Sequence, residues 1–165
     1  MNPAIKQWLN SVCVWIDATP LSQAMQNAPW AIPAVQSVHI LAIAALMASM
    51  LMINLRLAGL VGRDQTLARV SARFSPVMWW ALPVLLASGL ILVIGEPARA
   101  LKNNLFQIKM LLVVSAIIVT AFFSLPLKKN PAHWDSRAGL GMLVAVVSAA
   151  LWVGIVFAGR WIAYV

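Results

Sequence analysis

Long apolar runs dominate the chain, and short segments that carry charged residues and helix breakers separate them. A helix that crosses a bilayer takes about 20 residues, and four runs reach that length: approximately residues 33–60, 77–95, 105–125 and 140–158. The segments between them, 61–76, 96–104 and 126–139, contain Pro, Gly, Asn and charged side chains, which is typical of loops. The pattern predicts an all-α protein, an integral membrane four-helix bundle.

The first 30 residues differ from these runs because polar residues interrupt them. Within residues 4–18, apolar side chains recur at the spacing of one helix face and polar side chains occupy the other face. We therefore expect a retained amphipathic helix that lies in the membrane interface, with its tryptophans at headgroup depth. A cleaved signal peptide is the alternative, but Asn10, Ser11 and Asp17 would interrupt its apolar core.

Composition supports a membrane protein and bounds its size. Of the 165 residues, 62% are hydrophobic and 10% are charged, whereas roughly a quarter of the residues of a soluble domain are charged. Four spans with short loops use nearly the whole chain, so we expect one domain over residues 1–165. Cys13 is the only cysteine, which excludes a disulfide within the chain.

The formal net charge of +8 raises the question of a nucleic-acid partner. The twelve Lys and Arg residues are scattered between the apolar runs and do not form a stripe on a soluble face. We therefore expect the lipid bilayer as the partner and no nucleic acid. Self-association as a homodimer, or assembly into a larger membrane complex, stays open.

The distribution of basic residues around the first span predicts the orientation. Only Lys6 precedes this span, whereas Arg56, Arg63, Arg69 and Arg73 follow in quick succession. Because cytoplasmic loops are enriched in Lys and Arg, the first loop is expected in the cytoplasm. Both termini and the loop around Lys102 are then periplasmic, as in a multi-pass protein of the bacterial inner membrane.

Two ionisable residues in the first span, His39 and Arg56, are 17 residues apart, or roughly 25 Å along a helix. Arg56 lies at the cytoplasmic rim, where anchoring to lipid phosphate is the expected role. His39 lies about one and a half turns inside the outer end, deep enough to need a polar partner. The same topology brings Glu96, Lys109, Arg160 and Tyr164 to that end.

These residues form the candidate site. We predict that His39, Lys109, Arg160 and Tyr164 bind a cofactor, with His39 as a metal ligand, because an intramembrane ionisable group usually serves function. In the structural alternative His39 bonds a neighbouring helix and the cations extend to the headgroups. No catalytic residue is predicted, because the chain contains no phosphate loop, no HExxH pair and no pair of intramembrane carboxylates.

The stretches "SVHILAIAALMASMLMINLRLAGL", "FQIKMLL" and "GRWIAYV" resemble an uncharacterised family of small bacterial inner-membrane proteins. This resemblance implies architecture and location, and no activity. More distantly, the chain is similar to copper-resistance D-type membrane domains and to membrane b-type cytochromes, which usually carry several histidines. Here the only histidines are His39 and His133, predicted on opposite sides of the membrane. Haem b is therefore a candidate only through His39 with a methionine, another weak ligand, an open site or a second copy of His39.

Other features bear on packing. Most methionines lie within the spans, where packing explains them better than copper(I) binding does. Small residues four apart, Ala44/Ala48, Ala45/Ser49 and Gly141/Ala145/Ala149, predict that the first and fourth spans pack together.

We expect a small membrane subunit or carrier linked to periplasmic redox or metal chemistry. The alternatives are a structural or accessory protein of a larger complex and a transporter of a small solute, for which residues 40–53 offer no polar pathway.

Overall fold

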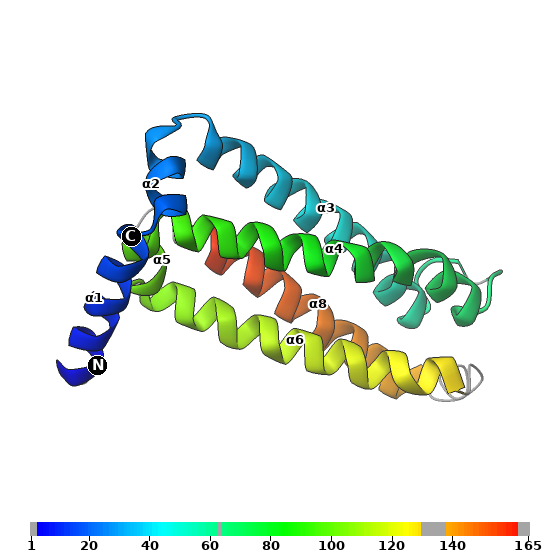
Figure 1. The fold of residues 1–165 in the computed structure, drawn as a ribbon. Coiled ribbons are helices and arrows are strands. Elements are labelled where there is room, and N and C mark those ends of the chain that lie inside the picture. Colours follow the sequence, from blue (N-terminus) through cyan, green and yellow to red (C-terminus); the bar gives the residue numbers. More distant parts are fainter. Residues whose placement is uncertain (1–2, 63, 130–137, 162–165) are drawn as a thin grey trace.

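Four long helices run side by side in the computed structural model, and three shorter helices gather at one end of them (Figure 1). The structure describes residues 3–62, 64–129 and 138–161, with the backbone alone for 3–6, 123–129 and 138. Within these ranges every regular element is a helix, which confirms the all-α class. The long helices are α3 (Ala31–Leu57), α4 (Leu67–Gly95), α6 (Asn104–Lys129) and α8 (Ala138–Trp161), and the shorter ones are α1 (Pro3–Asp17), α2 (Pro20–Asn27) and α5 (Pro97–Leu101).

Each long helix contains a stretch long and apolar enough to cross a bilayer. Only 11–33% of the residues in these stretches are buried inside the protein, so most of their apolar side chains face outward. A soluble monomer does not expose apolar surface on this scale, whereas lipid tails solvate it. The chain is a multi-pass membrane protein.

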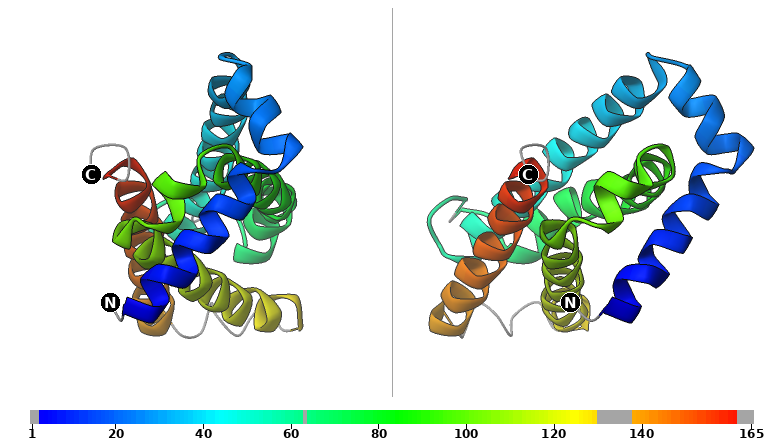
Figure 2. Two further views of the ribbon diagram at one scale, coloured as in Figure 1. Left: turned by 60° about the vertical axis from the view of Figure 1, so that its left-hand side comes forward. Right: turned by 90° about the vertical axis from the view of Figure 1, so that its left-hand side faces the viewer.

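The long helices pack as two hairpins that meet along α3 and α8 (Figures 1 and 2). Helix α3 packs most extensively against α4, and α6 packs against α8. The second contact between the hairpins, α4 with α6, is slight over the described residues. All four helices still contribute to one apolar cluster, in which the least exposed side chains are Leu46, Met50, Met78, Ala81, Ala116, Trp152 and Ile155.

A glycine allows α8 to approach α3 closely. A Cβ atom added at Gly141 would lie 3.2 Å from the Leu57 carbonyl oxygen and 3.1 Å from Leu57 Cδ1. Ala145, one turn further along α8, is buried in a cluster with Leu57. The prediction that the first and fourth spans pack together is confirmed, with Gly141 and Ala145 at the crossing, whereas Ala44 and Ala48 of the first span are exposed.

One end of the bundle, here called the α5 end, is covered by α1, α2 and α5 (Figure 1). The α1–α2 corner is closed by Thr19, whose hydroxyl donates to Ile16 O at 2.6 Å and accepts from Ser22 N at 3.3 Å. This hydroxyl and the proline that follows it are typical of a helix start. The predicted helix over residues 4–18 is therefore present with nearly those bounds, and its exposed Trp8 and Trp15 lie on one face.

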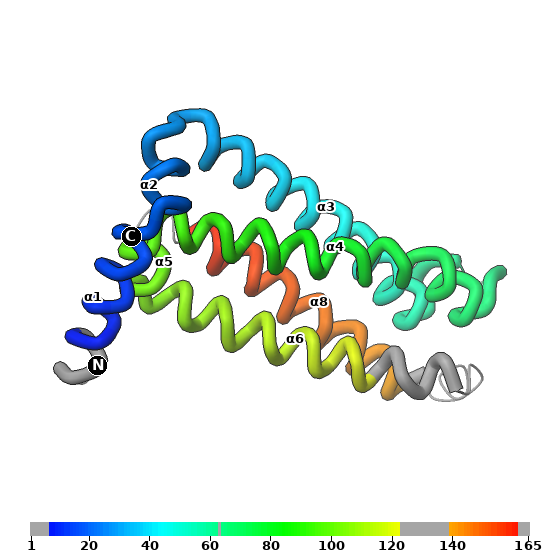
Figure 3. The backbone as a smooth tube through the Cα atoms, viewed as in Figure 1, coloured from blue at the N-terminus to red at the C-terminus, as the bar shows by residue number. Residues whose placement is uncertain are grey.

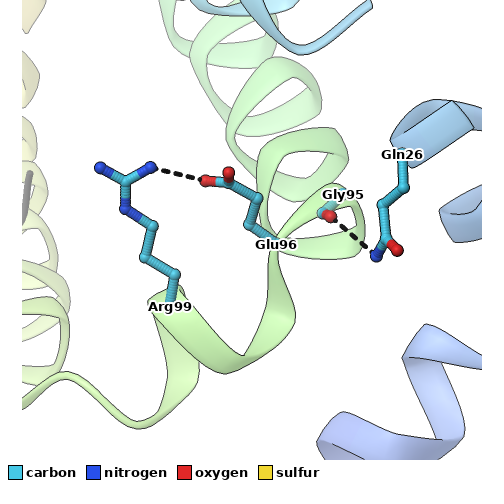
Figure 4. Close-up of polar contacts among 4 residues, drawn as sticks. All are labelled: Gln26, Gly95, Glu96 and Arg99. Atoms are coloured by element: carbon cyan, nitrogen blue, oxygen red, sulfur yellow. Dashed lines mark hydrogen bonds and ion pairs between the residues drawn. The ribbon is translucent and has the colours of Figure 1, made fainter. Parts of the chain in front are cut away.

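Helix α2 holds the last turn of α4. Ser22 Oγ donates to Ile94 O at 2.7 Å, and Gln26 Nε2 donates to Gly95 O at 3.1 Å (Figure 4). The last carbonyl groups of a helix have no partner within it, so side chains from α2 satisfy groups that lipid could not. On the other side of the same turn, Arg99 pairs with Glu96 at 3.0 Å (Figure 4).

The opposite end, here called the Arg56 end, carries the α3–α4 connection. Helix α3 ends in a turn in which Gly59 and Gly62 adopt φ values of 70° and 66°, a region that favours glycine. Arg56 Nε donates to Gln65 O across this turn at 2.8 Å. Arg56 thus fixes the loop, whereas the sequence had predicted anchoring to lipid phosphate as its role.

Some boundaries differ from the prediction. Helix α4 begins at Leu67, ten residues before the expected span, and includes Arg69, Arg73 and Pro76. Thr66 starts it by accepting a hydrogen bond from Arg69 N at 3.3 Å, so the helix extends beyond the apolar stretch. Helix α5 lies in a segment expected as a loop, and no element was predicted where helix α2 lies, although each helix begins with a proline at its first position. Figure 3 shows the resulting path of the chain.

Candidate functional site

His39 lies on α3 and points to α4, not to lipid. Its ring is half-buried, and its Nδ1 lies 2.8 Å from Ser88 Oγ. Its Cε1 lies 3.5 Å from the place that a Cβ atom would take at Gly89, so the ring rests on helix backbone that no side chain covers. Ser88 precedes the end of α4 by seven residues, which places His39 about 10 Å inside the α5 end.

The bonds of Ser88 determine which nitrogen of His39 carries the proton. The single hydroxyl hydrogen of Ser88 is directed to Val84 O, at 2.6 Å on its own helix. With that hydrogen directed to Val84 O, Ser88 Oγ accepts from His39, and the ring carries its hydrogen on Nδ1. The lone pair of the neutral ring is then on Nε2, and Nε2 is the atom that could take a proton or bind a metal.

Lys109 enters the same end from α6. It lies five residues after the start of α6, about 7.5 Å inside the end of that helix. Its side chain is half-buried and runs along Gly159 on α8, with Nζ 3.5 Å from the place of a Cβ atom there. The absence of a side chain at Gly159 leaves the space that the lysine fills.

No anion compensates the charge of Lys109 within the described part of the chain. Among the described residues no Asp or Glu forms an ion pair with Lys109, whose side chain is half-buried, whereas Glu96 pairs with Arg99. His39 and Lys109 enter the same end of the bundle, His39 against Ser88 of α4 and Lys109 against Gly159 of α8. A half-buried cation without a counter-ion among the described residues is suited to an acidic ligand.

The other predicted site residues either make different contacts or lie outside the described residues. Arg160 follows Gly159 on α8, and its side chain is exposed and engaged in another contact. Tyr164 and His133 lie outside the described residues. Glu96 forms its ion pair at the end of α4, eight residues beyond Ser88, or about 12 Å along the helix. Of the four predicted site residues, His39 and Lys109 turn into the bundle at the same end, His39 against α4 and Lys109 against α8, and a shared site stays a prediction.

A closed metal site made by the protein alone is not formed by the described residues, because no three His, Cys, Asp or Glu side chains gather in them. His39 is also the only histidine among them. A haem or metal would thus rely on Nε2 of His39 and on ligands of another kind. Met50 and Met78 do not supply a copper site here, since both are packed in the apolar core.

A shallow groove of about 510 Å³ runs between α3 and α4 on the outside of the bundle. Apolar side chains line it, among them Val38, Val84 and Trp80, and neither His39 nor Lys109 reaches it. Lipid tails are the expected occupants of such a surface within a span. The groove is therefore separate from the polar site.

Several contributors to the region were missed or only partly anticipated from the sequence. Gly89 and Gly159 provide the space for His39 and Lys109, and nothing in the order of the residues distinguishes them from packing glycines. Ser88 bonds across helices to His39, whereas Ser37 bonds Pro33 O in its own helix. Asn54 donates to Ser148 at 3.3 Å inside the bundle, and a polar amide within a span was the available signal for it.

Comparison with known proteins gives the chain a family and no activity. No curated protein and no solved structure gave a significant match. A family model described as a family of unknown function (DUF6644) matches residues 30–165, which include all four spans, and the chain belongs to this family.

Proposed function

We propose that the protein is a small membrane subunit or carrier that binds an acidic ligand at the α5 end, in a site formed by His39 and Lys109. One observation carries the proposal: the ammonium group of Lys109 is held inside a span, against Gly159, with no anionic partner among the described residues. Maintaining such a charge costs free energy, and a ligand that supplies a carboxylate or phosphate would offset that cost.

His39 gives the site a hydrogen-bond acceptor or metal ligand. The bond to Ser88 leaves Nε2 of a neutral ring unprotonated and able to accept a hydrogen bond from a ligand or to coordinate a metal. The pair thus offers one cationic donor and one neutral acceptor to the same ligand.

Binding of an acidic ligand is tested by its effect on the unfolding of the purified protein. Titration with inorganic phosphate, and separately with short-chain phosphatidylglycerol, should raise the melting midpoint in the wild type at constant ionic strength. Phosphate alone would identify a soluble anion, and the lipid alone would identify a headgroup. A midpoint that neither compound changes would overturn the proposal.

A redox or metal role is the narrower form of this proposal. A haem would use the Nε2 lone pair of His39 as an axial ligand and Lys109 as a partner for a propionate. The visible spectrum of protein purified from its native membrane separates this role from the broader one. A Soret band that disappears in His39→Ala would support the redox or metal role, and a colourless, metal-free preparation would contradict it. The distant resemblance to copper-resistance D-type domains and b-type cytochromes stays a prediction.

A structural or accessory role is the second candidate, and the bond between His39 and Ser88 favours it. A hydrogen bond across two spans stabilises helix packing even where nothing binds. In that case His39→Gln and Lys109→Met would leave every ligand response unchanged and would alter only the stability of the protein or its assembly with partners.

We infer that the α5 end faces the periplasm of a bacterium and that both termini lie on that side. The support is the concentration of Arg residues in and around the α3–α4 connection. This orientation would open the His39–Lys109 site to periplasmic ligands. Reporter fusions near Gln65 and near Lys102 test this orientation.

A further inference from the structure

Buried polar side chains also occur on α3, α6 and α8, away from His39 and Lys109. Asn54 and Ser148, which bond each other at 3.3 Å, are 7% and 3% exposed. Thr120 on α6 and Trp152 on α8 are 6% and 5% exposed, yet no hydrogen-bond partner reaches Thr120 Oγ1 or Trp152 Nε1 among the described residues. Two polar atoms therefore lack a partner inside membrane spans, where lipid cannot supply one.

Contacts nearer the α5 end fix the register of α6 and α8. Gly159 lies against Lys109, and a Cβ atom at Gly154 would lie 3.7 Å from Leu112 Cδ1. Because the two helices are antiparallel, each step along α6 corresponds to one step back along α8 (Figure 1). Continuing this register places Thr120 at the depth of about residues 146–148 of α8, the level of Ser148.

The directions of the side chains bring the unsatisfied atoms together. Trp152 lies four residues after Ser148, on the same face of α8, and side chains lean toward the N-terminus of their helix. Trp152 therefore leans toward Ser148. On the antiparallel α6 the same rule directs Thr120 back toward Trp152. The two unsatisfied atoms thus converge on the layer that contains the Asn54–Ser148 bond.

We propose that this layer is an internal water site, enclosed by Asn54, Thr120, Ser148 and Trp152. The indole Nε1–H of Trp152 can only donate, whereas the hydroxyl groups can also accept. A water molecule can accept from Trp152 and donate to the Thr120 and Ser148 oxygens, which is the number of partners that a buried water requires. The water would also join the two hairpins, since Asn54 belongs to α3 and the other three residues belong to α6 and α8.

Nuclear magnetic resonance of the full chain in lipid nanodiscs, labelled with ¹⁵N-tryptophan, tests the site directly. The signal of the Trp152 indole is identified by its loss in Trp152→Phe, while the other indole signals report whether the fold is kept. The proposal expects cross-relaxation between the Trp152 Nε1 hydrogen and water, both in the wild type and in Thr120→Val. The valine variant matters because a hydroxyl that exchanges with solvent could imitate a water contact. Absence of the cross-peak from either protein overturns the proposal.

The melting midpoint of Thr120→Val is an independent test, because its change has a different sign if the Thr120 hydroxyl bonds an internal water than if it is unsatisfied. Valine has nearly the shape of threonine and lacks its hydroxyl group. If the hydroxyl bonds an internal water, its loss deprives that water of a partner and lowers the melting midpoint. If the hydroxyl is unsatisfied, its replacement by a methyl group raises the midpoint or leaves it unchanged, which would contradict the water site.

Discussion

Replacing Lys109 with methionine should stabilise the ligand-free protein and weaken its binding of anions. Methionine keeps most of the apolar length that packs against Gly159 and removes the charge. A lysine at the centre of a span costs about 2.5–3.5 kcal/mol, and this cost decreases toward the interface. Because Lys109 lies only five residues inside α6, we expect Lys109→Met to raise the free energy of unfolding by about 1–2 kcal/mol.

The effect on binding has the opposite sign. An ammonium group and an anion 4 Å apart attract each other by about 4 kcal/mol at an effective dielectric constant near 20, before the cost of removing water from both. If about half of this attraction remains, loss of the charge weakens binding about 30-fold, since each 1.4 kcal/mol is tenfold. A ligand present at 100 times its dissociation constant stabilises the wild type by about 2.7 kcal/mol, and most of this stabilisation would be lost in the variant.

Unfolding in detergent, with and without phosphate at constant ionic strength, measures both effects on the same samples. Lys102→Met is the matched control, because it removes an exposed charge at the same end of the bundle. The control should leave both the stability and the response to phosphate nearly unchanged. The reasoning is refuted if Lys109→Met destabilises the ligand-free protein while its midpoint still rises with phosphate as in the wild type.

Three further predictions follow from the fold and the orientation. Gly141→Val should destabilise the protein by about 1–3 kcal/mol in denaturant unfolding, because its side chain meets the backbone of α3. Gly139→Val should be close to neutral, because a Cβ atom there would meet no atom of the described residues within 4 Å outside its own helix backbone. Ser88→Ala should cost about 1–2 kcal/mol by the same measurement, because it leaves a half-buried imidazole nitrogen without its partner. Reporter fusions near Gln65 should behave as cytoplasmic and those near Lys102 as periplasmic, and the reverse pattern would invert the proposed orientation.

The spans could be predicted from the sequence because hydrocarbon imposes one simple requirement, an apolar run of sufficient length. The start of α4 could not be predicted in this way. Its first turns lie beyond the apolar stretch and carry Arg69 and Arg73, so a helix there depends on the cap that Thr66 provides and not on hydropathy. Helix α2 was missed for a similar reason, since its polar side chains serve the carbonyl groups of α4.

The candidate site could be predicted only in part. Topology alone indicated that His39 and Lys109 approach the same end, because both lie near the same ends of their spans. The direction of each side chain depended on neighbours that the sequence does not mark. His39 turns to α4 because Ser88 and Gly89 offer an acceptor and open backbone, and Lys109 turns to α8 because Gly159 leaves room. Such small residues have the same appearance in a sequence whether they serve packing or a site.

Native mass spectrometry of the protein, released gently from its own membrane, tests the central claim most directly. The measurement compares the wild type with Lys109→Met and Lys102→Met. The proposal predicts an acidic molecule of defined mass bound to the wild type and to Lys102→Met, with its occupancy strongly reduced in Lys109→Met. A wild-type protein without any such molecule, or equal occupancy in all three proteins, would contradict an acidic-ligand site at Lys109.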